Sequence, residues 1–241
     1  LTGFWYLYSY NILMEEKISI VIPNYNGRDL LLKNLPNVIK YSQNAEIIVV
    51  DDASDDDSVV LVRKKFKRVR IIKKVKNEGF AKTANLGVLR AKNNYVLLLN
   101  SDVSPRRDFI KVAVKNFGPK VFAVGLCDMS HENGKIIARG RGGANFKQGF
   151  VRHFPATIEK GETLWVSGGS SIYKKDLFIK LGGFDTIYSP FYWEDIDLSF
   201  RAWRSGYICL FEPFSKVDHF HEEGIIKKIK VFRGYIKLKN F

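Results

Sequence analysis

The residues best suited to chemistry are polar side chains that end short apolar runs. The uncharged run YVLLL, residues 95–99, is followed directly by Asn100, Ser101 and Asp102. Carboxylate and amide oxygens favour hard cations such as Mg²⁺ or Mn²⁺, which usually take one or two protein carboxylates and add substrate phosphates. Asp102 alone could be a solvated turn residue. As a metal ligand, it could hold a cation that bridges a diphosphate.

A second acidic cluster follows another apolar run. The segment VVDDASDDDS places five carboxylates between Asp51 and Asp57. Ser54 is expected to cap a helix whose first turn contains the last three acids, where the helix dipole favours negative charge. Asp52 directly follows the predicted strand, so it is expected to accept hydrogen bonds from the N–H groups of a ligand.

A third group of acids opens a predicted helix in FYWEDIDL. Glu194, Asp195 and Asp197 follow Tyr192 and Trp193. Acids at a helix start are expected on dipole grounds alone. However, an aromatic wall excludes water, and desolvation raises the basicity of a carboxylate toward that of a general base. Asp195 could therefore take a proton from a hydroxyl nucleophile.

Two histidines, His219 and His221 in VDHFHEEG, alternate along a predicted strand and so point to the same face. Either could be a structural residue, or could complete a metal shell. A zinc site is disfavoured because no cysteine partners or HExxH spacing accompany them. No phosphate-binding GxxxxGK[ST] segment is present, and NEGFAKTANLGV does not match a dinucleotide fingerprint.

The elements that must position these residues alternate between strand and helix, as in βαβ units with a parallel sheet. Strands are predicted at 18–22, 47–50, 69–72 and 95–99, and helices at 28–41, 80–91, 174–181 and from about 194. The carboxyl ends of parallel strands meet at one edge, where open α/β sheets bind ligands. The polar residues that follow the predicted strands should therefore lie close together at this edge of the sheet. After about residue 124 the sequence becomes irregular and glycine-rich.

The composition predicts a globular chain with an anionic partner. The 241 residues are 46% hydrophobic and carry a formal net charge of +14. Nucleic acid, an acidic membrane or a phosphate-bearing substrate would each fit this charge. Only Cys127 and Cys209 are present, so we expect two reduced, buried thiols rather than a disulfide scaffold.

Both ends of the sequence are predicted to lie outside the main domain. Residues 1–13 are apolar but shorter than a membrane span, and are expected to be an upstream extension or artefact before Met14. Residues 225–241 alternate apolar and basic residues at helical spacing. This tail is predicted to be a basic amphipathic helix on an anionic membrane, with packing against the body or truncation as the alternatives.

Taken together, these segments resemble glycosyltransferase family two, the inverting nucleotide-sugar transferases with the GT-A fold. The resemblance runs from about Lys17 to about Gly224 and rests on ISIVIPNYNGRDLL, EIIVVDDASDDDS, NEGFAKTANLGV, YVLLLNSDVSP, WVSGGSSIYKKDLF and GGFDTIYSPFYWEDIDLSFRAWRSGY, followed by a late histidine. The resemblance is strongest to the rhamnosyltransferase-type members that build bacterial surface polysaccharides.

The resemblance implies an α/β fold with a Rossmann-like, mostly parallel sheet flanked by helices. A single domain over 14–224 would combine a nucleotide-binding half at 17–124 with a smaller, mixed acceptor half at 125–224.

The resemblance also implies roles for individual residues. Donor binding is implied for Pro23, Tyr25, Asp52, Gly79, Asn85, Asn100, Ser101, Asp102, Gly168 and Gly169. Asn100 and Asp102 occupy the ends of the family's Asp-x-Asp motif, and the Asn places more of the metal binding on Asp102. Asp195 matches the catalytic base, with Glu194 before it. His219 matches the late metal ligand slightly better than His221.

The implied reaction is a single displacement with inversion, assisted by Mg²⁺ or Mn²⁺. The donor would be a UDP- or dTDP-linked sugar, and the acceptor a glycan or lipid-linked glycan. The resemblance places the protein in the cytoplasm, with possible contact to the inner face of the membrane. Two alternatives stay open. A nucleic-acid-binding module would explain the charge but not the carboxylates, which repel phosphate. A transferase-like subunit without activity would explain the motifs.

Overall fold

A computed structural model describes residues 17–220 except 43, 133, 149 and 191. The predictions for residues 1–13, for His221 and for the basic tail at 225–241 therefore lie outside the described residues. Within the described part, no helix has both the length and the apolar character needed to cross a membrane.

The first half alternates strands and helices as the sequence predicts. Its elements are β1 (Ile18–Asn24), α2 (Arg28–Tyr41), β2 (Glu46–Asp51), α3 (Ser58–Lys65), β3 (Val69–Lys73), α4 (Phe80–Arg90) and β4 (Tyr95–Leu99). The second half contains β5 (Val103–Pro105), α5 (Phe109–Val114), β6 (Val121–Glu132), β7 (Lys135–Arg139), β8 (Gly142–Lys147), β9 (Phe150–Pro155), β10 (Gly161–Thr163), β11 (Ser170–Lys174), α6 (Lys175–Lys180), a 3₁₀ helix (Thr186–Tyr188), α7 (Glu194–Arg204) and β12 (Ile208–His219).

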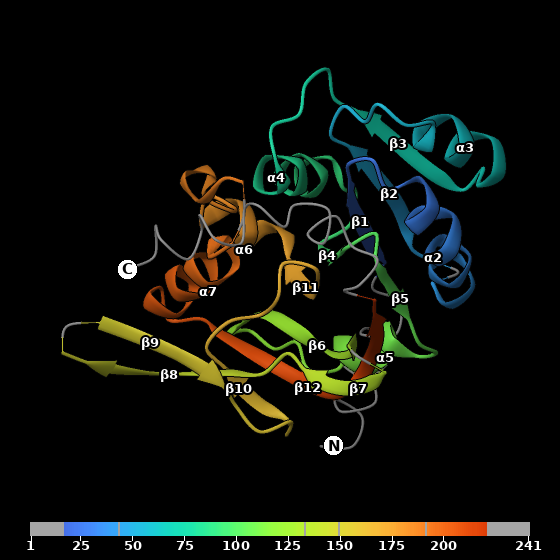
Figure 1. Cartoon of the computed structure of the whole chain (residues 1–241). Coiled ribbons are helices and arrows are strands. Elements are labelled where there is room, and N and C mark those ends of the chain that lie inside the picture. Colours follow the sequence, from blue (N-terminus) through green and yellow to red (C-terminus); the bar gives the residue numbers. More distant parts are fainter. Residues whose placement is uncertain (1–16, 43, 133, 149, 191, 221–241) are drawn as a thin grey trace, which may run out of the picture.

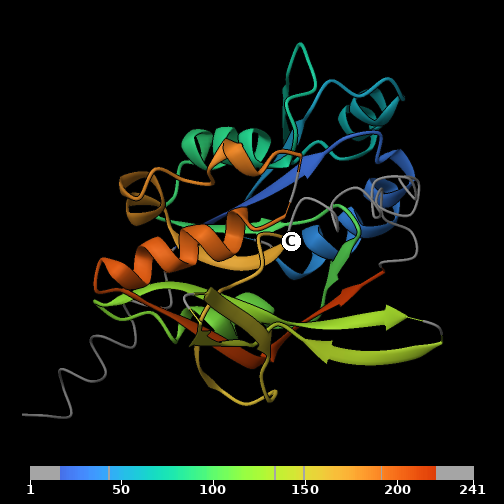
Figure 2. The same cartoon turned by 60° about the vertical axis from the view of Figure 1, so that its left-hand side comes forward.

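One mixed sheet carries both halves, in the order β10-β12-β6-β11-β4-β1-β2-β3, with β5 beside β12 and β7 beside β6. Strand β1 is parallel to β2 and β4, whereas β11 is antiparallel to β4 and β6. Strands β8 and β9 form a separate hairpin that projects from the body of the domain (Figure 1), and Figure 2 shows the paired strands β6 and β7 extending at the right. The predicted α/β class and mainly parallel nucleotide-side sheet are confirmed.

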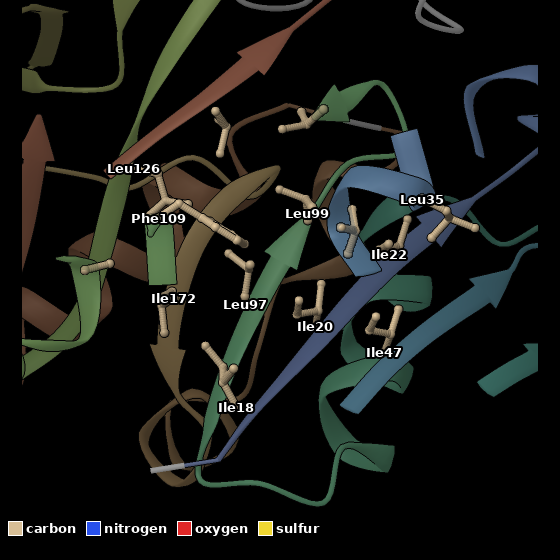
Figure 3. Close-up of a cluster of buried hydrophobic side chains, with 14 of the residues drawn as sticks. Ile18, Ile20, Ile22, Leu35, Ile47, Leu97, Leu99, Phe109, Leu126 and Ile172 are labelled. Carbon is tan, nitrogen blue, oxygen red and sulfur yellow. The ribbon is translucent and has the colours of Figure 1, made fainter. Parts of the chain in front are cut away.

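The central strands are apolar throughout because both of their faces are covered. Side chains alternate between the two faces of a strand. Leu97 and Leu99 of β4 pack with Leu35 of α2 in one core cluster (Figure 3). Leu98 lies in a second cluster with Val88 of α4. A run such as YVLLL thus needs no polar alternation.

One local prediction about the acidic cluster is wrong. Helix α3 begins at Ser58, with Asp57 as its N-cap residue and no acid in its first turn. Ser54 lies in the preceding loop, where its hydroxyl donates to Asp51 Oδ2 at 2.5 Å and accepts from the backbone N–H of Asn26 at 2.9 Å. The buried Asp51 carboxylate requires hydrogen-bond donors, and this need holds Ser54 out of the helix.

The parallel register brings the polar strand ends together. Asn24 pairs with Asp51 across β1 and β2, and Asn24 Nδ2 donates to Asp51 Oδ2 at 2.9 Å. Strand β4 runs parallel on the other side of β1, so Asn100 follows at the same edge. The predicted gathering of the strand ends is confirmed. The two cysteines are free and buried, also as predicted.

The close packing of α4 on the sheet makes a testable prediction at Gly87. A Cβ atom there would lie 2.2 Å from Val21 Cγ1 and 3.0 Å from Val50 Cγ2. Gly87→Ala should lower the free energy of unfolding by about 1–3 kcal/mol through overpacking, although alanine favours helix by about 1 kcal/mol. Urea unfolding measures the change. Gly118→Ala is the matched control, because a Cβ there meets nothing within 4 Å. Equal stability of both variants would contradict the close packing.

Candidate active site

A cleft at the carboxyl edge of the parallel strands contains most of the predicted site residues. Those lining it are Pro23, Tyr25, Asp52, Gly79, Asn100, Ser101, Asp102, Gly168, Gly169, Glu194 and Asp195. They come from the ends of β1, β2 and β4, the loop before α4, the loop before β11 and the first turn of α7. Acids that are far apart in the sequence therefore share one cavity. Phe80, Pro190 and Tyr192 add apolar and aromatic walls.

Asp52 is held by the protein itself. It is 4% exposed, and its carboxylate accepts from Lys74 Nζ at 2.7 Å and from the backbone N–H groups of Glu78 and Gly79 at 3.0 and 2.8 Å. A buried charge needs such partners. In this structure its oxygens order the loop that leads into α4, and the predicted contact of Asp52 with ligand N–H groups stays a prediction.

The Asp52 ion pair depends on Lys74, which the sequence did not single out. The Lys74 side chain is 8% exposed and also donates to Thr83 Oγ1 at 3.1 Å. Lys74 lies in a long basic stretch, and the sequence alone does not distinguish it from the other basic residues there. Lys74 is distinguished by its position in the folded protein, where its side chain contacts Asp52.

The two glycines before β11 allow close packing within the protein. A Cβ on Gly169 would lie 2.4 Å from Asn100 Nδ2, and the backbone N–H of Asn100 donates to Gly169 O at 2.9 Å. A Cβ on Gly168 would lie 3.2 Å from the Phe80 ring. The glycines thus let this loop lie against β4 and α4, which forms the floor of the cleft.

Asn85 lies apart from the cleft. Its side-chain amide donates to Phe184 O at 2.8 Å and accepts from Phe184 N–H at 2.9 Å. The Asn85 side chain therefore fastens α4 to the chain segment after α6. This segment leads toward the acidic start of α7, so Asn85 supports the site from outside.

His219 does not line the cleft itself but contacts Asp102, which does. Strands β12 and β5 are antiparallel, with His219 opposite Val103, which places the imidazole beside Asp102. His219 Nε2 lies 3.4 Å from Asp102 Oδ1, and His219 Nδ1 lies 2.6 Å from Asp128 Oδ2. Burial lowers the pKa of His219, but the hydrogen bonds and charges of Asp102 and Asp128 outweigh it and raise the pKa to about 10.

The donor set of Asp102 and His219 fits a divalent cation that is shared with a ligand. Asp102 Oδ1 is buried, and apart from the ion-pair contact with His219 Nε2 at 3.4 Å it has no hydrogen-bond partner, which is unusual for a carboxylate oxygen. Among the described residues, no three His, Cys, Asp or Glu side chains converge as a complete metal site. One carboxylate and one imidazole would suffice where a diphosphate and water supply the other ligands.

The acids at the start of α7 are held in an apolar setting. Glu194 is 5% exposed, and its Oε2 has no hydrogen-bond partner. Burial, together with the charge of Asp195, raises the pKa of Glu194 to about 7. Glu194 therefore holds its proton more tightly than an exposed glutamate does.

Asp195 is firmly oriented. It accepts hydrogen bonds from the backbone N–H groups of Gly168 at 3.2 Å and Ile196 at 2.8 Å. Burial raises the pKa of Asp195, while these hydrogen bonds and the nearby His153 act in the opposite direction. The third acid, Asp197, instead forms an ion pair with Arg201 at 2.6 Å within α7. Of the three acids at the start of α7, only Glu194 and Asp195 thus line the cleft.

The sequence matches the family model described as glycosyl transferase family 2 over residues 19–182, which is more than half of the chain. An uncharacterized glycosyltransferase of Rickettsia felis is 32% identical over 177 residues, 69% of this chain and 28% of that protein. A poly-beta-1,6-N-acetyl-D-glucosamine synthase of Staphylococcus aureus is 26% identical over 218 residues, 85% of this chain and 50% of that protein. The chain thus spans half or less of each of these two relatives.

Solved structures share the fold. GalNAc-T7 with UDP, GalNAc and Mn²⁺ superimposes with a TM-score of 0.72 at 20% identity, over 85% of this chain and 44% of the other. S. aureus TarS 1–349 in complex with UDP-GlcNAc gives a TM-score of 0.66 at 18% identity, over 85% and 58%. These likenesses identify the GT-A architecture of the sheet. By its sequence match, the chain belongs to glycosyl transferase family 2.

Proposed function

We propose that this chain is the catalytic domain of an inverting, cation-dependent glycosyltransferase. It would move a sugar from a nucleoside-diphosphate donor to an acceptor hydroxyl during synthesis of a surface polysaccharide. The observation that supports this most is the shared cleft. Asp102, with an oxygen that lacks a hydrogen-bond partner, and Asp195, an oriented and buried carboxylate, line the same cavity.

The chemistry would be one displacement at the anomeric carbon. Asp195 takes the proton of the acceptor hydroxyl as the oxygen attacks, and the bond between the anomeric carbon and the diphosphate oxygen breaks on the opposite face. Burial favours this role because it raises the basicity of the carboxylate. The hydrogen bonds from Gly168 and Ile196 hold the carboxylate in place for the transfer.

Negative charge develops on the departing diphosphate. A divalent cation held by Asp102 and His219 would act as a Lewis acid and neutralise that charge. Asn100 and Ser101 line the cleft beside Asp102, while Pro23 and Tyr25 line it at the end of β1. These residues are our candidates for contacts with the nucleoside diphosphate, and Gly168 and Gly169 for contacts with the sugar.

Glu194 would act as a neutral acid near physiological pH. With a pKa of about 7 it can retain its proton near physiological pH. A protonated carboxyl can donate a hydrogen bond to a substrate hydroxyl, as buried neutral acids do in other active sites. Because its Oε2 is buried without a partner, this carboxyl can make such a contact without losing one inside the protein.

The donor class follows from the neighbours and the chemistry of the cleft. TarS was solved with UDP-GlcNAc and GalNAc-T7 with UDP and Mn²⁺. We therefore propose a UDP- or dTDP-linked sugar, with a rhamnosyl-type transfer as the narrower hypothesis, and a glycan or lipid-linked glycan as acceptor. Nucleic acid fits less well, because the cleft presents carboxylates where phosphates would have to bind without a cation.

The first prediction concerns the base. Asp195→Asn should lower kcat by about 10²–10⁴-fold while donor affinity changes little, because the amide cannot accept the proton. Steady-state kinetics and calorimetric titration with the donor separate the two effects. Asp176→Asn on the exposed first turn of α6 is the control and should leave both unchanged. Full activity of the Asp195 variant would remove Asp195 from the mechanism.

The second prediction concerns the cation. Asp102→Ala should abolish the increase in UDP affinity that Mn²⁺ causes, since the variant loses a carboxylate ligand. Calorimetry with and without Mn²⁺ measures this, and circular dichroism checks that the variant is folded. An unchanged Mn²⁺ effect in a folded variant would show that the cation binds elsewhere.

The third prediction concerns pH and stability. The pKa of Glu194 is about 7 in the folded protein and 4.5 in its reference state, so the native state binds this proton more tightly. Wild-type stability must therefore fall, relative to Glu194→Gln, as pH rises from about 4.5 to above 7. The full difference is about 3 kcal/mol, because each pKa unit corresponds to about 1.4 kcal/mol.

Urea unfolding of wild type and Glu194→Gln between pH 4 and 8.5 tests this third prediction. Glu162→Gln on β10 is the control, because Glu162 is exposed. A stability difference between wild type and Glu194→Gln that does not change with pH would mean that Glu194 is ionised throughout.

A further inference from the structure

We propose that Asp128 is a positioning residue that fixes the orientation and tautomer of His219 for cation binding. This inference rests on the proposed cation site but concerns a residue outside the cleft. Asp128 lies on β6, in the region of the sequence that shows no family motif. It is 8% exposed and does not line the cleft, so it would act through the imidazole alone.

The Asp128 carboxylate is fixed from two sides. Its Oδ2 lies 2.6 Å from His219 Nδ1, and its Oδ1 accepts from Ser130 Oγ at 2.8 Å. Ser130 is fully buried. With one oxygen held by Ser130, the other is directed at the imidazole. The result is a continuous line of contacts, Ser130 to Asp128 to His219, that ends at Asp102.

The strand register explains why these side chains meet. Strands β6 and β12 are parallel, with Val217 opposite Asp128 and His219 opposite Ser130. Residues two apart on a strand share a face, so Asp128, Ser130 and His219 point to the same side. The register shifts between Glu212 and Lys216, where β12 advances four residues while β6 advances one. This irregularity brings His219 level with Ser130.

The hydrogen bond to Asp128 determines which ring nitrogen of His219 can bind a metal. A metal binds a neutral imidazole through the nitrogen that carries no proton. A cation that binds His219 must replace the proton on Nε2, and the proton on Nδ1 then stays in the hydrogen bond to Asp128 Oδ2. His219 Nε2 is the atom that lies 3.4 Å from Asp102 Oδ1. Asp128 thus holds Nε2 on the side of Asp102 Oδ1, where the two atoms could share a cation, and outer-shell carboxylates of this kind raise metal affinity.

The test is Mn²⁺ binding in the presence of UDP, followed by the electron paramagnetic resonance signal of free Mn²⁺. Asp128→Ala should weaken Mn²⁺ binding by about 10–100-fold. Asp128→Asn keeps the shape and one acceptor oxygen, so its loss should be smaller. Glu132→Gln is the matched control on the same strand, because Glu132 forms an ion pair with Arg139 at 3.0 Å, and it should bind Mn²⁺ as wild type does.

A double-mutant cycle separates positioning from general structural support. If Asp128 acts only through the imidazole, Asp128→Asn combined with His219→Ala should bind Mn²⁺ no more weakly than His219→Ala alone. Fully additive losses, or wild-type affinity in both folded Asp128 variants, would overturn the inference while leaving the cation site intact. A wild-type protein that does not bind Mn²⁺ with UDP would instead overturn the cation assignment, and this inference with it.

Discussion

The need to satisfy buried carboxylates governs the whole carboxyl edge of the sheet. Asp51 is bound by Asn24 and Ser54, and Asp52 by Lys74 and the loop before α4. The contacts with Asn24, Lys74 and Gly79 join segments more than twenty residues apart in the sequence, so the acids hold the loops around the cleft. At this edge, the loops are therefore positioned so that their hydrogen-bond donors reach the buried Asp51 and Asp52 carboxylates.

Against that background, two oxygens differ from the rest. Among the described residues, the buried carboxylate oxygens without a hydrogen-bond partner are Asp102 Oδ1 and Glu194 Oε2. Both residues line the cleft. An unsatisfied buried acceptor is costly, and a protein tolerates it where a ligand or a proton supplies the missing interaction. A cation at Asp102 and a proton on Glu194 would meet both needs, and the two residues would then serve the leaving group and the acceptor respectively.

Much of the fold and the membership of the cleft could be predicted from sequence. Strand and helix patterns give reliable elements where apolar runs are long and uninterrupted, as in 95–99, and parallel strands bring their ends to one edge. The other features of the site could not be predicted, because they depend on residues that come together only in the folded protein. Ser54 has the residue type of a helix cap, but Asp51 competes for its hydroxyl. Asp52 looks available for a ligand until Lys74 is seen to face it, and the role of Asp128 follows from a register shift in β12 that no local pattern encodes.

The central claim is that Asp102 and His219 hold a cation against a nucleoside diphosphate. Electron–nuclear double resonance on the protein with Mn²⁺ and UDP tests it directly. The account predicts phosphorus couplings from directly bound phosphates together with a nitrogen coupling that disappears in His219→Ala. Mn²⁺ bound with neither coupling would contradict it.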